Sequence, residues 1–203
     1  MTKERPIIFS APMVRAILDG KKTQARRVVK ISNEDQVVTR GKIVWMGPEG
    51  LEWKPAGATR VAASQECINL MCPYGVPGDR LWVREELLEQ QGIWVYKEDR
   101  QPVLLDKTYE AQMLVWAHRK ETDYCASIHM PRWASRLTLE VVNVQVERVQ
   151  DISEAEARAE GMGGIGVREH FKAAWDYLNG KGSWDTNPWV WVIEFKRVGG
   201  LNG

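Results

Sequence analysis

The segment 135–150 (SRLTLEVVNVQVERVQ) limits the possible fold more than any other part of the chain. Its apolar residues alternate as in a strand, but the alternation changes parity halfway. The apolar positions are Leu137, Leu139 and Val141, and then Val142, Val144 and Val146. Because neighbouring side chains of a strand point to opposite faces, this change requires a bulge or corner inside one long strand. Such a strand is typical of a β-barrel, whose sheet must bend in order to close.

The rest of the chain predicts further strands and a few short helices. Strands are expected at residues 6–10, 80–86 and 188–198, the last with Trp189, Trp191, Ile193 and Phe195 on one face. Helices are expected at 11–19, at 153–160 and at 167–178. The second opens with the capping box Ser153-x-x-Glu156 and stops at Gly161. With no regular β-α-β-α alternation, the pattern indicates an α+β fold.

Two segments, at about 31–74 and 88–130, interrupt this pattern with short β-like pieces between Gly, Pro and Asn residues. We interpret residues 1–203 as one domain with two β-rich insertions.

The charge balance limits the possible partners. The 28 Lys and Arg residues against 27 Asp and Glu residues leave a net charge of +1, so any affinity for nucleic acid must come from a local patch. No apolar run is long enough for a membrane helix, and the N-terminus MTKERP lacks the apolar core of a signal peptide. We therefore expect a cytoplasmic protein without a membrane partner.

Four blocks, in order along the chain, carry a resemblance to a known family: IIFSAPMVRAILDGKKTQARR, PYGVPGDRLWVRE, DISEAEARAEG and NPWVWVIEF. Together they resemble the ASCH family, and more closely the longer ASCH proteins of bacteriophages and prophages. The resemblance implies a PUA-like β-barrel in a bacterial host cytoplasm and a role connected with RNA or nucleotides. In small bacterial members it implies hydrolysis of the amide of N4-acetylcytidine.

The resemblance also implies a catalytic pair. The family's lysine lies in a Gly-x-Lys-x-x-Thr-x-Arg pattern, which places it on Lys22, and its acidic residue falls on Glu160. Arg27 also matches, but Ala25 stands at the threonine position, so the family's proposed nucleophile is missing. If this segment is extended, Thr23 lies about 7 Å from the missing hydroxyl, which makes a simple replacement doubtful.

Basic and aromatic residues near this pattern suggest a binding surface. Arg26 and Arg27, with Thr23, follow the first helix, where they could contact phosphates; the alternative is a solvated basic loop. A second group, His129, Arg132 and Trp133, suits phosphate contacts with base stacking, or else forms a structural corner. Asn187 and Trp189 would close one end of the pocket, unless Asn187-Pro188 is only a turn.

The cysteine and histidine spacings bear on a metal site. Cys67 and Cys72, with Cys125 and His129, have spacings that two arms of a zinc site could use, but the first pair is wider than the usual knuckle. We assign no metal ligand and no cofactor.

Three functions remain open. The first is binding of RNA, single-stranded nucleic acid or a modified nucleoside in a basic cleft, with catalysis lost at Ala25. The second is an active hydrolase, an amidohydrolase or a ribonuclease, that uses Lys22 and Glu160 with a water. The third is a phage protein that binds a host protein through its insertions.

Overall fold

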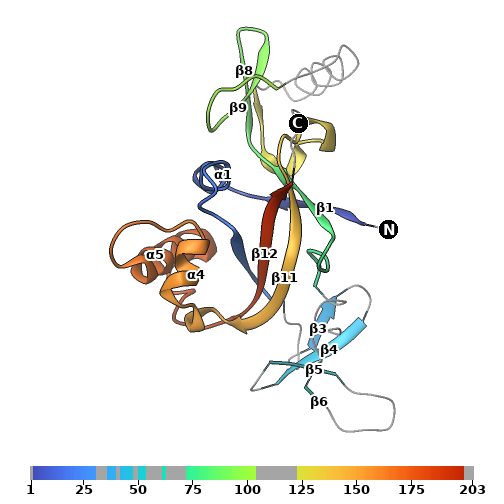
Figure 1. Cartoon of the computed structure of the whole chain (residues 1–203), viewed down its shortest axis with the longest axis vertical. Coiled ribbons are helices and arrows are strands. Elements are labelled where there is room, and N and C mark those ends of the chain that lie inside the picture. Colours follow the sequence, from blue (N-terminus) through green and yellow to red (C-terminus); the bar gives the residue numbers. More distant parts are fainter. Residues whose placement is uncertain are drawn as a thin grey trace.

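The computed structural model describes residues 2–30, 72–103 and 123–198, and the backbone of four strands between residues 36 and 62. Within this part, one five-stranded sheet organises the molecule in the order β1-β7-β11-β12-β2 (Figure 1). Its strands are β1 (Glu4–Ile8), β2 (Gln24–Val28), β7 (Arg80–Arg84), β11 (Thr138–Arg148) and β12 (Trp189–Val198). β1 runs parallel to β7, and the other neighbours are antiparallel.

The long strand β11 confirms the bulge that its sequence predicts. Its register against β12 shifts between Val141 and Asn143, where the apolar parity changes. Both strands curve strongly along their length (Figure 1). The bulge therefore lets apolar side chains before it, Leu139 and Val141, and after it, Val144, face the same main core.

Helices pack against both faces of this sheet. They are α1 (Ala11–Leu18), α4 (Glu154–Ala159) and α5 (Val167–Asn179), with short 3₁₀ turns at Ser127–His129, Arg132–Ala134 and Val149–Asp151. The predicted capping box is present at α4, where the Ser153 side chain accepts from the Glu156 amide and the Glu156 side chain accepts from the Ser153 amide. The short helix ends at Ala159 with Glu160 as its C-cap, and Gly161 follows with a φ of +94°.

Strand β12 is buried on both faces. Its predicted apolar face, Trp189, Trp191, Ile193 and Phe195, lies in the main core with residues of β1, α1 and β7. Val190 and Val192 on the opposite face pack in a second cluster beneath α4 and α5. A strand buried on both sides reads as a continuous apolar run, as residues 188–193 (PWVWVI) do.

The fold is a mixed α+β fold, but the described strands do not close into the barrel that the sequence suggested. β1 pairs only with β7 and β2 pairs only with β12, so these two strands are the edges of an open sheet. A side chain spans the gap between the edges, because Arg27 Nη2 of β2 donates to the main-chain oxygen of Ile8 at 2.8 Å.

Two smaller sheets fall largely within the segments expected as insertions. One comprises β3 (Gln36–Thr39), β4 (Lys42–Gly47), β5 (Gly50–Trp53) and β6 (Val61–Ala62). The other comprises β8 (Leu87–Gln90), β9 (Ile93–Tyr96) and β10 (Tyr124–Cys125).

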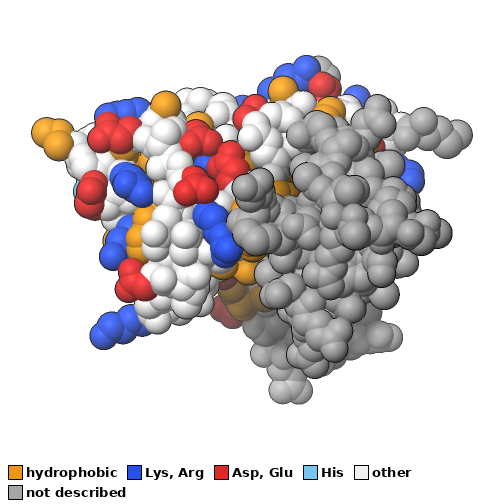
Figure 2. Space-filling model, turned by 90° about the horizontal axis from the view of Figure 1, so that it is seen from below, with side chains coloured by type: hydrophobic (Ala, Val, Ile, Leu, Met, Phe, Trp, Pro, Cys, Tyr) orange, Lys and Arg blue, Asp and Glu red, His pale blue; other side chains and the backbone are white. Residues whose placement is uncertain are grey.

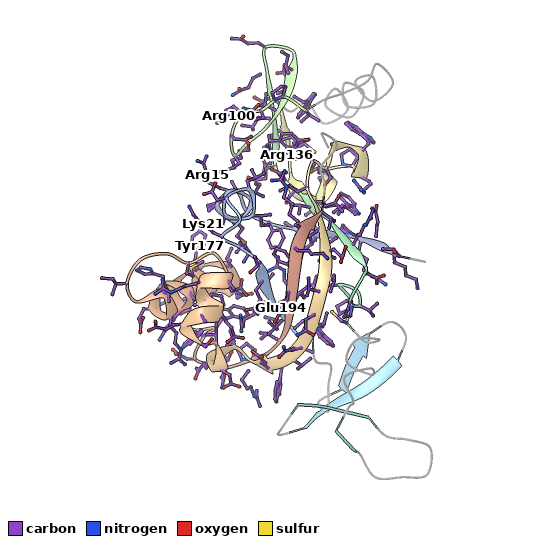
Figure 3. All side chains as sticks on the ribbon, in the orientation of Figure 1. Arg15, Lys21, Arg100, Arg136, Tyr177 and Glu194 are labelled. Atoms are coloured by element: carbon purple, nitrogen blue, oxygen red, sulfur yellow. The ribbon has the colours of Figure 1, made fainter. Side chains whose placement is uncertain are left out.

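The hairpin β8–β9 is joined to the main sheet through Arg136 (Figure 3). Its guanidinium pairs with Glu85 at 2.7 Å and with Asp99 at 2.6 Å, and it lies 3.9 Å from the ring centroid of Tyr96. These contacts order the junction between the two sheets.

No helix in the described ranges is long and apolar enough to cross a membrane. On the face seen in Figure 2, the described acidic and basic side chains are intermingled, as the near-zero net charge leads one to expect. A cationic site must therefore be sought locally.

Candidate functional site

Lys22 and Glu160 meet in the interior, although 138 positions separate them in the sequence. Lys22 lies between α1 and β2, where its amide donates to Ala16 and its backbone forms an isolated bridge with Glu160. Its Nζ lies 2.7 Å from Glu160 Oε2 and 2.8 Å from the Glu160 main-chain oxygen. The lysine side chain is 1% exposed and the glutamate side chain 5%. The structure thus brings Lys22 and Glu160, the two residues that the resemblance singles out, into direct contact.

Burial dominates the electrostatics of Lys22. It lowers the pKa of the ammonium group, and the neighbouring Arg27 and Arg26 lower it further, while the Glu160 carboxylate acts in the opposite direction. A lysine in such surroundings gives up its proton more readily than one in water. It is nevertheless held by both of its acceptors and sealed from solvent.

Arg26 is neutralised by carboxylates. Its guanidinium is fully buried and lies 3.0 Å from Glu156, 3.3 Å from Glu147 and 3.4 Å from Glu160. It also donates to Gln24 Oε1 at 2.6 Å. With three carboxylates around it, Arg26 is not a free phosphate ligand; its charge is used inside the fold.

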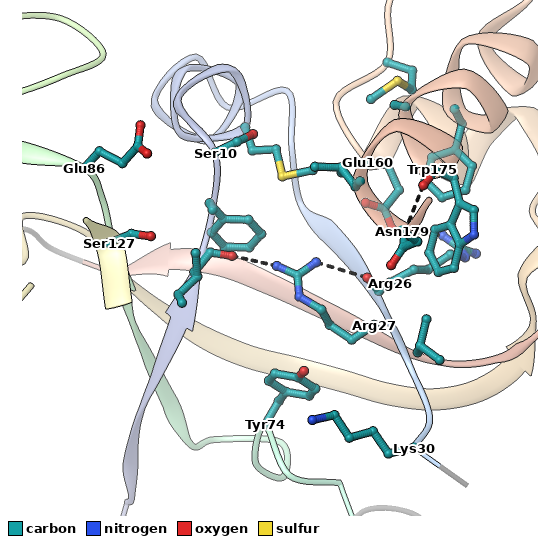
Figure 4. Close-up of a pocket in the computed structure, with 18 residues that line it drawn as sticks. Ser10, Arg26, Arg27, Lys30, Tyr74, Glu86, Ser127, Glu160, Trp175 and Asn179 are labelled. Atoms are coloured by element: carbon teal, nitrogen blue, oxygen red, sulfur yellow. Dashed lines mark hydrogen bonds and ion pairs between the residues drawn. The ribbon is translucent and has the colours of Figure 1, made fainter. Parts of the chain in front are cut away.

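A cavity of about 550 Å³ lies beside this cluster, between the edge strands β1 and β2 and helix α5 (Figure 4). Its volume is in the range of small-molecule sites. Both polar and aromatic side chains line it, among them Phe9, Arg27, Tyr74, Glu160, Phe171 and Trp175. The cavity occupies the place where the main sheet fails to close.

Arg27 is the distinctive cation of this cavity. It is half-buried, and it donates to the main-chain oxygens of Ile8 at 2.8 Å and of its neighbour Arg26 at 3.0 Å. Its guanidinium lies 5.1 Å from the centroid of the Phe9 ring. Among the described residues no carboxylate is within ion-pair distance of Arg27. Burial lowers its pKa, yet a guanidinium remains charged at neutral pH.

Lys30 adds a second positive charge at the same end. It is exposed, lines the cavity and lies near Tyr74 in Figure 4. Arg27 and Lys30 therefore make one end of the cavity cationic, whereas the end at Lys22, Arg26 and Glu160 is compensated internally.

The residues at and near the missing threonine lie away from the cavity. Ala25 is 0% exposed and belongs to the main core, opposite Ile193 on the neighbouring strand. Thr23 is exposed and lines a separate shallow hollow with Gln24, Glu156 and Glu194. Thr23 therefore does not line the cavity, and its predicted part in a binding site stays a prediction.

The group around residue 130 is not part of the cavity lining, apart from Ser127. Arg132 pairs with Glu4 at 2.9 Å and lies 5.8 Å from the Trp82 ring. Trp133 packs against the cluster beneath the hairpin β8–β9, and His129 is exposed at the end of a 3₁₀ turn. These contacts fit the structural-corner alternative, because the aromatic and basic groups are used in packing.

Asn187 and Trp189, just before and at the start of β12, also lie outside the cavity lining. Asn187 has a φ of +44°, and its Oδ1 accepts from the Gln150 amide at 3.0 Å, as in a turn. Trp189 is 7% exposed in the main core, with the Arg148 guanidinium 4.2 Å from its ring centroid. Neither lines the cavity.

Sequence reasoning missed the aromatic wall. Phe171, Ala174, Trp175 and Leu178 lie on one side of α5, at the spacing of an apolar helix face. All four line the cavity, and Leu178 is 50% exposed. Tyr74 and Phe9 gave no sequence signal, because they reach the cavity from a loop and from the end of a strand.

Metal-binding geometry is not seen in the described ranges. They hold no group of three or more His, Cys, Asp and Glu residues that could bind a metal ion. Cys72 is buried in the main core and Cys125 in the cluster beneath β8–β9, while Cys67 lies outside the described residues.

No family model matches the chain. A search of curated proteins finds no significant match. A solved structure that does match is the crystal structure of protein EF3133 from Enterococcus faecalis V583, of family DUF984. It is 11% identical, with a TM-score of 0.41 over all of this chain and 85% of its own. At that distance, fold and function must be argued from this chain's own residues.

Proposed function

We propose that the cavity binds a nucleotide, free or as one unit of RNA or another single strand, and that the chain is a diverged ASCH protein. The open, curved sheet would then be a PUA-like barrel whose last gap, between β1 and β2, serves as the binding site. The four sequence blocks and the meeting of Lys22 with Glu160 support this assignment.

The observation that carries the proposal is Arg27. A half-buried guanidinium beside an aromatic ring, with only carbonyl acceptors among the described residues, is suited to an incoming anion. Lys30 reinforces it, and Phe9, Phe171 and Trp175 supply the apolar walls that a base requires. A nucleotide matches both features of the cavity, since its phosphate suits the cations Arg27 and Lys30 and its base suits the apolar walls.

Binding is favoured over catalysis because the lysine is sealed. Glu160 lines the cavity, but Lys22 is 1% exposed and donates to two oxygens of Glu160. To act on a substrate its Nζ would have to leave both. Ala25, deep in the core, offers no nucleophile.

A hydrolase is the second candidate, and the lowered pKa of Lys22 beside a carboxylate that reaches the cavity favours it. Incubation with N4-acetylcytidine followed by chromatography separates the two. Release of cytidine by the wild type but not by Lys22→Met supports the hydrolase, whereas no release leaves the binding proposal.

Binding itself is tested with labelled single-stranded RNA, by fluorescence anisotropy over a range of salt concentrations. We expect affinity to fall with salt, and Lys30→Ala to weaken binding for all sequences and reduce the log–log salt slope by about 0.7. Lys21→Ala is the matched control, because Lys21 is an exposed lysine paired with Asp19 outside the cavity. Equal losses in both variants, or no binding at low salt, would contradict the proposal.

A further inference from the structure

Two buried nitrogens at one end of the cavity have no hydrogen-bond partner within the described part of the chain: Trp175 Nε1 and Arg26 Nε. Both residues line the cavity, and they are only 4% and 3% exposed. Buried donors in native proteins nearly always have an acceptor. An acceptor is therefore expected from something that enters the cavity.

The charges at this end indicate what kind of acceptor fits. Arg26 and Lys22 face three carboxylates, those of Glu147, Glu156 and Glu160. A further anion would be repelled by this excess of negative charge. The neighbouring ring of Phe171, 6.0 Å from that of Trp175, makes the surroundings apolar. A neutral acceptor, such as a carbonyl oxygen, suits both conditions.

The end at Lys30 selects for an anion. Arg27 and Lys30 carry positive charge without a carboxylate partner among the described side chains. In Figure 4 Lys30 lies apart from Trp175, and Arg27 lies between them and donates to the main-chain oxygen of Arg26. The two ends of the cavity therefore differ in charge. The end at Arg27 and Lys30 suits an anion, and the end at Arg26 and Trp175 suits a neutral hydrogen-bond acceptor.

We infer that Trp175 determines base specificity: the indole N–H donates to a carbonyl oxygen of a base whose phosphate lies at Arg27 and Lys30. This inference rests on the proposed function and adds the orientation of the ligand. It predicts a preference for bases with an oxo group over bases with an amino group at the same ring position.

Matched nucleotides test the preference by isothermal titration calorimetry. Inosine and adenosine 5′-monophosphate differ at C6, oxo in the first and amino in the second, and in the hydrogen that N1 carries only in the first. We expect the wild type to bind inosine monophosphate about tenfold more tightly, the value of one buried hydrogen bond. Trp175→Phe should bring the ratio close to one. Trp184→Phe should retain it, because Trp184 belongs to the same cluster but does not line the cavity.

A measurement on the wild type keeps the test independent of how well Trp175→Phe folds. In a ¹H–¹⁵N spectrum, one of the 10 indole N–H resonances should move downfield on saturation with inosine monophosphate and not with adenosine monophosphate. Equal affinities, an unchanged ratio in a folded Trp175→Phe variant, or static indole resonances would overturn the inference while nucleotide binding stands. If the wild type binds neither nucleotide nor RNA, the proposed function fails, and the inference with it.

Discussion

Lys22 Nζ donates to two oxygens of Glu160, the carboxylate at 2.7 Å and the main-chain oxygen at 2.8 Å. The two residues also form a backbone bridge, so the link joins the end of α4 to the turn between α1 and β2. Both side chains are almost completely buried. The pair therefore also has a structural role, because it holds the C-terminal end of α4 against the turn between α1 and β2.

The first prediction concerns this pair. Lys22→Met leaves the Glu160 carboxylate buried with only the more distant Arg26 as a counter-charge, at 3.4 Å. Removing one partner of a buried ion pair typically lowers the free energy of unfolding by about 3–5 kcal/mol, and Arg26 should keep the loss at about 3 kcal/mol. Urea denaturation measures it.

Lys21→Met is the control for this prediction, because the Lys21–Asp19 pair is exposed and should contribute less than about 1 kcal/mol. Equal midpoints for Lys22→Met and the wild type would show that the buried pair does not stabilise the fold.

The second prediction concerns Ala25, which stands where the ASCH pattern has a threonine. Ala25→Thr adds a methyl and a hydroxyl group to a fully buried position in the main core, opposite Ile193. We expect a loss of about 1–3 kcal/mol from overpacking, without a gain of activity on N4-acetylcytidine, because the side chain does not line the cavity. Thermal unfolding and chromatography measure the two effects.

Thr23→Ala provides the comparison. Its side chain is exposed, so we expect a change within about 0.5 kcal/mol. An Ala25→Thr variant as stable as the wild type, or one that hydrolyses acetylcytidine, would refute this account of residue 25.

The sequence was sufficient for the elements with strong local signals. The parity change in β11, the Ser153–Glu156 capping box and the apolar face of β12 all follow from spacing, and the structure confirms each of them. Closure of the sheet could not be predicted in the same way. Whether β1 and β2 pair depends on where two distant edges meet, and no local pattern encodes that.

The site shows the same division. The sequence predicted Arg26 and Arg27 as two phosphate contacts, but the structure gives them different surroundings. Adjacent residues of a strand point to opposite faces. Only Arg26 forms ion pairs with Glu147, Glu156 and Glu160. Trp175 looked like core because its spacing is that of a buried helix face. Only the three-dimensional arrangement shows that this face also borders a cavity.

The third prediction concerns pH. Burial raises the pKa of the Cys125 thiol to about 11, against about 8.5 for an exposed cysteine. At pH 8 only about one native thiol in a thousand is then ionised, and alkylation by iodoacetamide should be very slow, rising about tenfold per pH unit. Because the folded state holds this proton more tightly, the contribution of Cys125 to stability should fall as pH rises from about 8.5 to 11.

Mass spectrometry of peptides after timed alkylation measures the rate at Cys125. Unfolding in urea should bring it to the rate of an ordinary thiol. Rapid modification of Cys125 at pH 8 without denaturant would show that the thiol is not buried as described.

The last prediction tests how Gly161 holds the site together. Gly161 follows Glu160 with a φ of +94°, and a Cβ at this position would lie 3.0 Å from Ala16 Cβ and 3.3 Å from Lys22 Cβ. Gly180 has a similar φ of +101°, but a Cβ there would have no atom within 4 Å. Gly161→Ala and Gly180→Ala therefore share the cost of the backbone conformation, and only the first adds a collision. We expect Gly161→Ala to be the less stable of the two by about 1–3 kcal/mol in urea denaturation.

Gly161→Ala should also weaken RNA binding, because relief of the collision moves Glu160 away from Lys22 and reshapes the cavity wall. Gly180→Ala should bind RNA like the wild type. Equal stability and equal binding in the two variants would mean that close packing of α4 against the turn after α1 does not shape the cavity.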